Sequence, residues 1–127
     1  MELKQAFFAD SYAIIDFFKG NKGFARFFEE EEIITTRLNL MEVYYWVLSD
    51  FDESKAEEHY SALLPFCIDL DDSVVKEAMK LRLRLKKQGK NVSYVDCIGY
   101  QFSLALKIKL LTGDREFKSM PNTEFIK

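Results

Sequence analysis

The sequence predicts a single α/β domain over residues 1–127, with three layers: a central, mostly parallel sheet of four to five short strands, flanked by helices. Short apolar runs alternate with stretches of helical periodicity, which is the pattern of strands joined by crossover helices. Of the 127 residues, 48% are apolar and 15% aromatic, enough for one core without disulfides or a structural metal. Only five Gly and two Pro are present, and no repeat, linker or low-complexity segment interrupts the pattern. Disorder and repeat architectures are therefore excluded.

The N-terminal third predicts one strand and two helices. An aromatic-rich run over 5–9 predicts the first strand, and apolar residues with helical spacing follow at Tyr12, Ile15 and Phe18. Glycines at 20 and 23 should end or kink this helix. We expect the acidic run 29–32 to close a second helix as a solvated loop.

The middle of the chain predicts two more strands around a pair of helices. The β-branched run 33–36 predicts a buried strand, and Asn39 with Glu42 forms an expected N-cap pair for the next helix. Asp52 should open a further helix that ends before Pro65. The apolar run 66–70 is a candidate third strand.

The C-terminal half predicts two helices and two strands. Asp71 or Asp72 should cap a long helix that runs to about Gln88 and is stopped by Gly89. Its expected apolar side consists of Val74, Val75, Ala78, Met79, Leu81, Leu83 and Leu85. Ser93 should cap the next helix, 108–111 should form a strand, and 125–126 a last edge strand.

Composition narrows the possible functions. The formal net charge is −3, from 18 basic and 21 acidic residues, so we do not expect binding of nucleic acid through overall positive charge, and any such binding must be local. Cys67 and Cys97 lack a CxxC spacing and predict reduced thiols, as in a cytoplasmic protein. With one histidine, His59, a multi-histidine zinc site is excluded, and we expect His59 to be a partly exposed helical residue rather than a catalytic base. No membrane-spanning helix or signal peptide is expected.

Four acidic residues should converge at one edge of the predicted sheet. Asp10 ends the first strand, Asp114 follows the strand at 108–111, and Glu42 and Asp96 lie in the first turns of helices. Ligands of parallel sheets bind outside the carboxyl ends of the strands, and right-handed crossovers bring all four acids to that edge. Each acid also has a structural explanation as a helix cap, a first-turn residue or a turn residue.

The joint placement of these acids favours a metal site. Four neighbouring carboxylates without a basic partner other than Arg115 would repel one another unless a cation lay between them. Oxygen ligands alone select a hard ion, Mg²⁺ or Mn²⁺. Such an ion readily takes phosphate oxygens, so the expected reaction is hydrolysis of a phosphodiester.

The residues around these acids resemble the PIN-domain ribonucleases, a group that includes the toxins of VapBC-type toxin–antitoxin pairs. The resemblance covers nearly the whole chain. It lies in Phe8–Ile15, in Asn39–Glu42, and in Tyr94–Ile98, with Asp114 following eighteen residues after Asp96 within Leu111–Phe117. The spacing of the last two segments is the most specific part.

The resemblance implies a metal-dependent endoribonuclease, with Asp10, Glu42, Asp96 and Asp114 as metal-binding and catalytic acids. It also implies Thr112 and Ser11 as supporting residues, an RNA substrate, a homodimer and an antitoxin protein that covers the acidic groove. Two positions depart from the family pattern: Lys107 replaces a frequent glycine, and Ser103 replaces a usual alanine. Both concern helix packing rather than the acids.

The role of a basic segment remains open, and two alternative functions are considered. Lys80, Arg84 and Lys87 belong to a basic run over 76–90 that is either a solvated helix face or a contact for RNA phosphates. A receiver-like phosphoacceptor would need an acid adjacent to Asp10 and a lysine after a late strand, and the sequence has neither. A catalytically inactive PIN-like module that binds RNA or protein is the other alternative.

Overall fold

The computed structural model describes residues 4–127, so the first three residues of the expected 1–127 domain lie outside the described residues. A four-stranded sheet with strand order β2-β1-β3-β4 forms the centre. Every pairing is parallel, so all the strands end at the same edge of the sheet. The strands are β1 (Ala6–Ala9), β2 (Glu32–Ile34), β3 (Lys109–Thr112) and β4 (Thr123–Phe125). The predicted α/β class and parallel sheet are confirmed.

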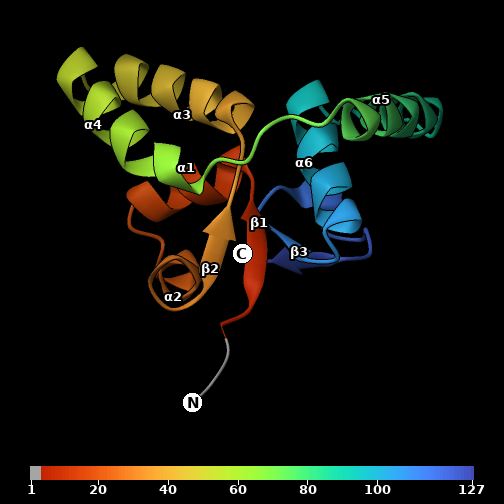
Figure 1. Ribbon diagram of the computed structural model, residues 1–127, viewed down its shortest axis with the longest axis horizontal. Coiled ribbons are helices and arrows are strands. Elements are labelled where there is room, and N and C mark those ends of the chain that lie inside the picture. Colours follow the sequence, from red (N-terminus) through yellow and green to blue (C-terminus); the bar gives the residue numbers. More distant parts are fainter. Residues whose placement is uncertain (1–3) are drawn as a thin grey trace.

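Helices connect the strands and cover both faces of the sheet (Figure 1). The α-helices are α1 (Ser11–Phe18), α2 (Lys22–Glu30), α3 (Arg37–Asp50), α4 (Glu53–Leu63), α5 (Asp72–Lys87) and α6 (Tyr94–Ala105), and the 3₁₀ helices are η1 (Leu64–Phe66) and η2 (Arg115–Phe117). Long α3 and α4 pack side by side, as do α5 and α6 on the other side of the molecule. None of the helices within residues 4–127 is long and apolar enough to cross a membrane.

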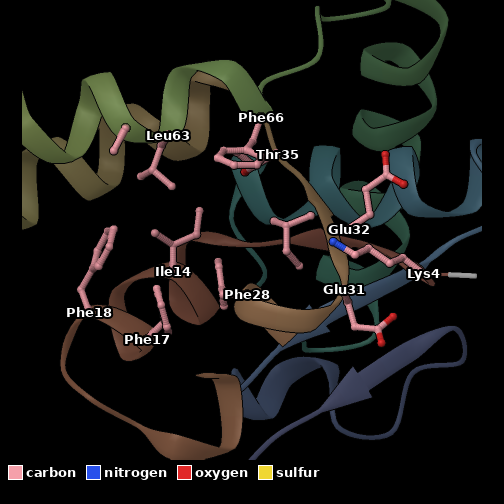
Figure 2. A pocket seen from close by; sticks show the side chains of 12 residues that line it. Lys4, Ile14, Phe17, Phe18, Phe28, Glu31, Glu32, Thr35, Leu63 and Phe66 are labelled. Atoms are coloured by element: carbon pink, nitrogen blue, oxygen red, sulfur yellow. The ribbon is translucent and has the colours of Figure 1, made fainter. Parts of the chain in front are cut away.

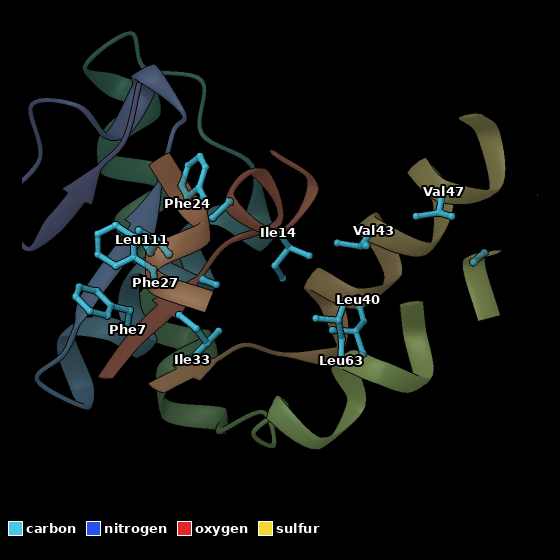
Figure 3. Packing of buried hydrophobic residues seen from close by; sticks show 13 residues of the cluster. Phe7, Ile14, Phe24, Phe27, Ile33, Leu40, Val43, Val47, Leu63 and Leu111 are labelled. Carbon is cyan, nitrogen blue, oxygen red and sulfur yellow. The ribbon is translucent and has the colours of Figure 1, made fainter. Parts of the chain in front are cut away.

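Successive side chains of a strand point to opposite faces of the sheet, so the core consists of two clusters, one on each face. Phe7 and Ala9 of β1 face a cluster formed with α1, α2, α3 and α4, whereas Phe8 faces a second cluster formed with α5 and α6. Figure 3 shows the first cluster, in which Phe7 meets Phe27 edge to face with ring centroids 5.0 Å apart. Because both faces are covered, β1 consists of apolar residues throughout.

The helix that carries Glu42 begins earlier than predicted. Thr36, not Asn39, is the N-cap of α3, because its hydroxyl accepts a hydrogen bond from the Asn39 amide at 3.4 Å. Asn39 lies inside the helix and is buried. Glu42 is therefore in the second turn and has no capping role, so the expected Asn39–Glu42 capping pair is wrong.

Two other predicted elements are also wrong. The acidic run 29–32 is not a loop, since α2 continues through Glu30 and β2 begins at Glu32. The run 66–70 is not a strand, because Pro65 lies in the 3₁₀ turn η1, which extends the end of α4. Only Cys67 pairs with the sheet, through an isolated parallel bridge to Thr35.

The long helix α5 matches its predicted capping by Asp71 and its end at Gln88, but its apolar face is narrower than expected. Val74, Ala78, Leu81 and Leu85 are buried at helical spacing, whereas Leu83 is 54% exposed. Leu83 follows Leu81 by two residues, and a 3.6-residue period turns it to the opposite side of the helix.

The end of α6 and the turn that leads to β3 accommodate the two departures from the family pattern. Lys107 has a φ of 57°, in the left-handed region where a glycine is unstrained. Ser103 is buried, and its hydroxyl donates to the Tyr100 carbonyl at 2.6 Å. A serine therefore fits in place of an alanine because the helix backbone satisfies its hydroxyl.

Candidate functional site

Asp10 lies at the junction of β1 and α1, where the central strand ends. One carboxylate oxygen, Oδ1, accepts a hydrogen bond from the Ala13 amide at 2.8 Å and so caps α1. The residue is 1% exposed, and the other oxygen, Oδ2, is buried without a hydrogen-bond partner among the described residues. A buried carboxylate oxygen in this state requires a proton or a cation.

The surroundings of Asp10 oppose its ionisation. Burial raises the pKa of Asp10 from 3.8 to about 8, and the charges of Asp96 and Asp114 raise it further, while interactions with the Thr112 side chain and the Ala13 amide act in the opposite direction. The sequence-predicted role of Thr112 as a residue beside the acids is consistent with this contact. Without a counter-charge, Asp10 is protonated at neutral pH.

Asp96 reaches the same region from the first turn of α6. Ser93 caps this helix and accepts a hydrogen bond from the Asp96 amide at 3.1 Å. One turn later, Gly99 lets α6 lie directly on the sheet, since a Cβ at this position would be 2.8 Å from the Phe8 ring. Burial raises the pKa of Asp96 to about 6, and the nearby charges of Asp114 and Glu42 contribute.

Glu42 is held by a chain of polar side chains that links α3 to α1. The Thr36 hydroxyl donates to Asn39 Oδ1 at 2.7 Å, and Asn39 Nδ2 donates to Ser11 Oγ at 3.1 Å. Ser11 Oγ in turn donates to Glu42 Oε1. Thr36 and Asn39 are buried members of the site that sequence reasoning missed in this role, although Thr36 is itself a favoured N-cap residue type.

Asp114 is the fourth acid, the N-cap of η2, two residues after the end of β3. Its amide donates to Thr112 Oγ1 at 3.0 Å, and its Oδ1 accepts from the Glu116 amide at 3.0 Å. These bonds make Asp114 a helix cap as well as a neighbour of the other acids. The turn thus fixes the carboxylate beside the end of β3.

The four predicted acids lie in one electrostatic neighbourhood rather than on separate surfaces. Asp96 and Asp114 raise the pKa of Asp10, and Asp114 and Glu42 raise that of Asp96. None of the four forms an ion pair with a basic side chain of residues 4–127, where the ion pairs are Arg37–Asp69 and Lys80–Glu77. Across the same residues, no three acidic, histidine or cysteine side chains are arranged as ligands of one ion. The site is therefore a cluster of acidic side chains without a basic counter-charge among the described residues.

Comparison with known proteins identifies the family. The model of the PIN domain family matches residues 7–122. The chain belongs to the PIN domain family. No curated protein sequence matches it.

Solved structures share the fold of this PIN domain at low sequence identity. The DNA-bound VapBC structure from Salmonella typhimurium aligns with a TM-score of 0.77 and 15% identity over 98% of both chains. VapC20 from Mycobacterium tuberculosis, described as a toxin that cleaves the sarcin–ricin loop, gives 0.75 and 16% over 95% of this chain and 99% of that one. A toxin–antitoxin complex from Klebsiella pneumoniae gives 0.72 and 17% over 93% and 95%.

The other sequence-predicted residues of this PIN domain form no hydrogen bond with the four acids among the described residues. Lys80, Arg84 and Lys87 are exposed on α5, and Lys80 forms an ion pair with Glu77 at 2.9 Å. His59 packs its ring against Phe18, with centroids 4.1 Å apart, and is partly exposed as expected. Both cysteines are free thiols.

An apolar hollow of about 480 Å³ lies on another part of the surface (Figure 2). Side chains of α1, α2 and η1, including Phe17, Phe28 and Phe66, form its walls, and Lys4, Glu31 and Glu32 stand together at one end. None of the four acids lines it. This hollow is therefore better suited to contact with another protein than to catalysis.

The polar chain to Glu42 gives a stability prediction. In Ser11→Ala, Asn39 Nδ2 loses its acceptor in a buried position, and we expect the free energy of unfolding to fall by about 1–3 kcal/mol. Urea denaturation followed by circular dichroism measures the change. The matched control is Ser54→Ala on the exposed side of α4, which should change stability by less than about 0.5 kcal/mol. If Ser11→Ala and Ser54→Ala are equally stable, the hydrogen bonds that link Thr36 to Glu42 do not stabilise the fold.

Proposed function

We propose that this PIN domain is a divalent-metal-dependent endoribonuclease that hydrolyses RNA phosphodiester bonds. One observation carries the proposal: the buried Asp10 oxygen without a partner, beside Asp96 and Asp114, which raise its pKa. A hard cation relieves all of these unfavourable interactions together, and oxygen ligands favour Mg²⁺ or Mn²⁺. The likeness of fold to VapC20, a described sarcin–ricin loop toxin, supports RNA as the substrate.

The proposed roles of the residues follow from their positions. Asp10, Asp96 and Asp114 would hold the metal, with Glu42 completing the set from α3, after side-chain rotations that bring their carboxylate oxygens around one ion. When bound, the metal would neutralise charge on the phosphate and lower the pKa of an attacking water. Glu42 Oε1 accepts a hydrogen bond from the Ser11 hydroxyl, which orients the carboxylate, and we assign its other oxygen to accept a proton from that water. Thr112 accepts a hydrogen bond from the Asp114 amide, and its side chain lies beside Asp10 and lowers the pKa of that carboxyl.

Basic side chains on α5 are proposed to contact the RNA backbone. Lys80, Arg84 and Lys87 are exposed and lie on a helix that packs against α6, the helix carrying Asp96. Neutralisation of phosphates by such residues makes affinity fall with salt concentration. Since Lys80 is already paired with Glu77, Arg84 and Lys87 should contribute more.

A protein partner is also proposed. Two of the similar structures are described as a toxin–antitoxin complex and as VapBC bound to DNA, which supports a toxin held inactive by an antitoxin. A cytoplasmic location of this pair is part of the proposal. Exposed Met41, Tyr45 and Leu48 form an apolar stripe on α3, which supports a homodimer or a further protein contact. The hollow of Figure 2 offers a second apolar surface.

The proposed function is tested by cleavage of RNA with and without metal. We expect the purified protein to cut RNA in millimolar Mn²⁺ or Mg²⁺ and to stop in EDTA, because uncompensated carboxylates repel a polyanion. Gel analysis of total RNA measures the reaction, and heat-inactivated protein is the control. If RNA binds but is never cut with any divalent ion, the chain is instead an inactive PIN-like binding module.

A further inference from the structure

We propose that a pocket formed by Tyr12, Gly113, Arg115 and Lys118 binds the single-stranded RNA segment next to the cleaved phosphate, with one base stacked on Tyr12. This inference rests on the proposed function and specifies how its substrate is held. The pocket has a volume of about 450 Å³, and Phe125 and Lys127 complete its lining. Such a volume is typical of sites for small organic groups.

The pocket is joined to the acidic site by the chain itself. Tyr12 follows Asp10 by two residues in the first turn of α1, and Gly113 and Arg115 flank Asp114. Since a helical turn rises about 5.4 Å, the Tyr12 backbone lies within one turn of Asp10. We therefore expect an RNA strand whose phosphate reaches the acids to place its neighbouring nucleotide at this pocket.

The Tyr12 ring is fixed on one side and open to solvent. A Cβ at position 113 would overlap this ring and would lie 2.9 Å from the carbonyl oxygen of Ile126, so only glycine allows the ring to lie against the backbone there. The side chain is nevertheless 45% exposed. An aromatic ring supported on one side and exposed beside a nuclease site is suited to stacking with a base.

The side chains of the pocket carry positive charge, opposite in sign to the acidic cluster. Arg115 and Lys118 are exposed, and neither forms an ion pair with an acidic side chain in the part of the chain that the structure describes. Glu116, which lies between them in sequence, does not line the pocket. Lys118 Nζ stands 5.8 Å from the Phe125 ring centroid, over an aromatic face. Cations and aromatic rings together favour a single-stranded polyanion with exposed bases over a plain anion.

The test measures RNA affinity separately from cleavage. In an Asp96→Asn background with millimolar Mn²⁺, fluorescence anisotropy follows a short, labelled single-stranded RNA of mixed sequence. We expect Tyr12→Ala to weaken binding about 5- to 100-fold, and Tyr12→Phe to retain the starting affinity because the ring is kept. Arg115→Ala with Lys118→Ala should lower the salt slope of binding by about 1.4, at about 0.7 per lost phosphate contact on a single strand.

The matched control variants remove positive charge from positions outside the pocket. Lys55 on α4 and Lys109 at the opposite end of β3 are exposed, so Lys55→Ala with Lys109→Ala should leave affinity and slope unchanged. The variant with Lys80, Arg84 and Lys87 all changed to Ala measures the contribution of α5 independently. Photocrosslinking with 4-thiouridine RNA should mark Tyr12 or an adjacent residue.

The outcomes separate this inference from the function on which it rests. If the protein cleaves RNA and the Tyr12 and Arg115–Lys118 variants bind it normally, the pocket is overturned and the nuclease stands. If a polyglutamate peptide binds as tightly as RNA with the same dependence on Tyr12, the pocket is a site for acidic proteins and the inference is wrong. If the unsubstituted protein neither binds nor cleaves RNA, the proposed function itself is overturned.

Discussion

Asp96→Asn is expected to lower the rate of metal-dependent RNA cleavage by at least about 100-fold while leaving the far-UV circular dichroism unchanged. The asparagine side chain has the same shape but no charge, so it is a poorer ligand for a divalent ion. It also cannot repel Asp10, Asp114 or Glu42, the acids with which Asp96 interacts. Initial rates on a labelled RNA in Mn²⁺, with a thermal melt of each protein, measure both effects.

The control for this variant is Asp72→Asn. Asp72 occupies the first turn of α5 just as Asp96 occupies that of α6, but it is exposed. Its substitution removes the same charge and the same favourable interaction with a helix dipole, about 0.3–1 kcal/mol, without touching the acidic cluster. Full activity in Asp96→Asn would remove this residue from the proposed catalytic set. Equal loss in both variants would indicate a general effect of charge.

The second large effect concerns pH and metal. The folded-state pKa of Asp10 is about 8, above the value of 3.8 that applies to the unfolded chain. Between these values the unfolded state releases a proton that the folded state retains, so the stability of the metal-free protein falls as pH rises, by up to about 1.4 kcal/mol per pH unit. Asp96, with a pKa of about 6, adds to the fall below that pH. We expect the wild-type protein in EDTA to be less stable at pH 8 than at pH 5.5 by about 3–4 kcal/mol.

Two comparisons identify Asp10 as the cause. Asp10→Asn keeps a capping side chain for α1 and should flatten this pH dependence. Asp71→Asn at the cap of α5 should leave it unchanged, because the hydrogen bonds of Ser73 and Val74 hold the pKa of Asp71 below its ordinary value and this carboxyl is ionised throughout the range. Urea denaturation at several pH values provides the free energies.

Added metal should reverse the destabilisation at high pH. Mn²⁺ at 100 times its dissociation constant should stabilise the wild type by about 2.7 kcal/mol at pH 8, and less at pH 5.5 where protons compete for the carboxylates. Asp10→Asn should show a much smaller response. A melting temperature of the wild type that does not change with Mn²⁺ at pH 8 would argue against a metal at these acids.

Local sequence signals were sufficient to predict most of the helices and strands. The caps at Asp52, Asp71 and Ser93 and the strand ending at Asp10 were predictable because short-range hydrogen bonding and apolar spacing determine them. Errors arose where two local signals competed. Thr36 and Asn39 are both good cap residues, and packing of α3 against α1 selects Thr36, which leaves Asn39 to bond Ser11.

The candidate site also combines features that the sequence predicted with features that only the tertiary structure decides. Position in the chain was enough to predict that Asp10, Glu42, Asp96 and Asp114 approach one edge of the sheet, because parallel strands with helical crossovers end at a common edge. The partners of their side chains depend on contacts between residues far apart in sequence. The link from Thr36 to Glu42 through Ser11, the unpartnered oxygen of Asp10 and the support of Tyr12 by Gly113 are of this kind. Burial and long-range packing decide these features, and no local pattern of residues encodes them.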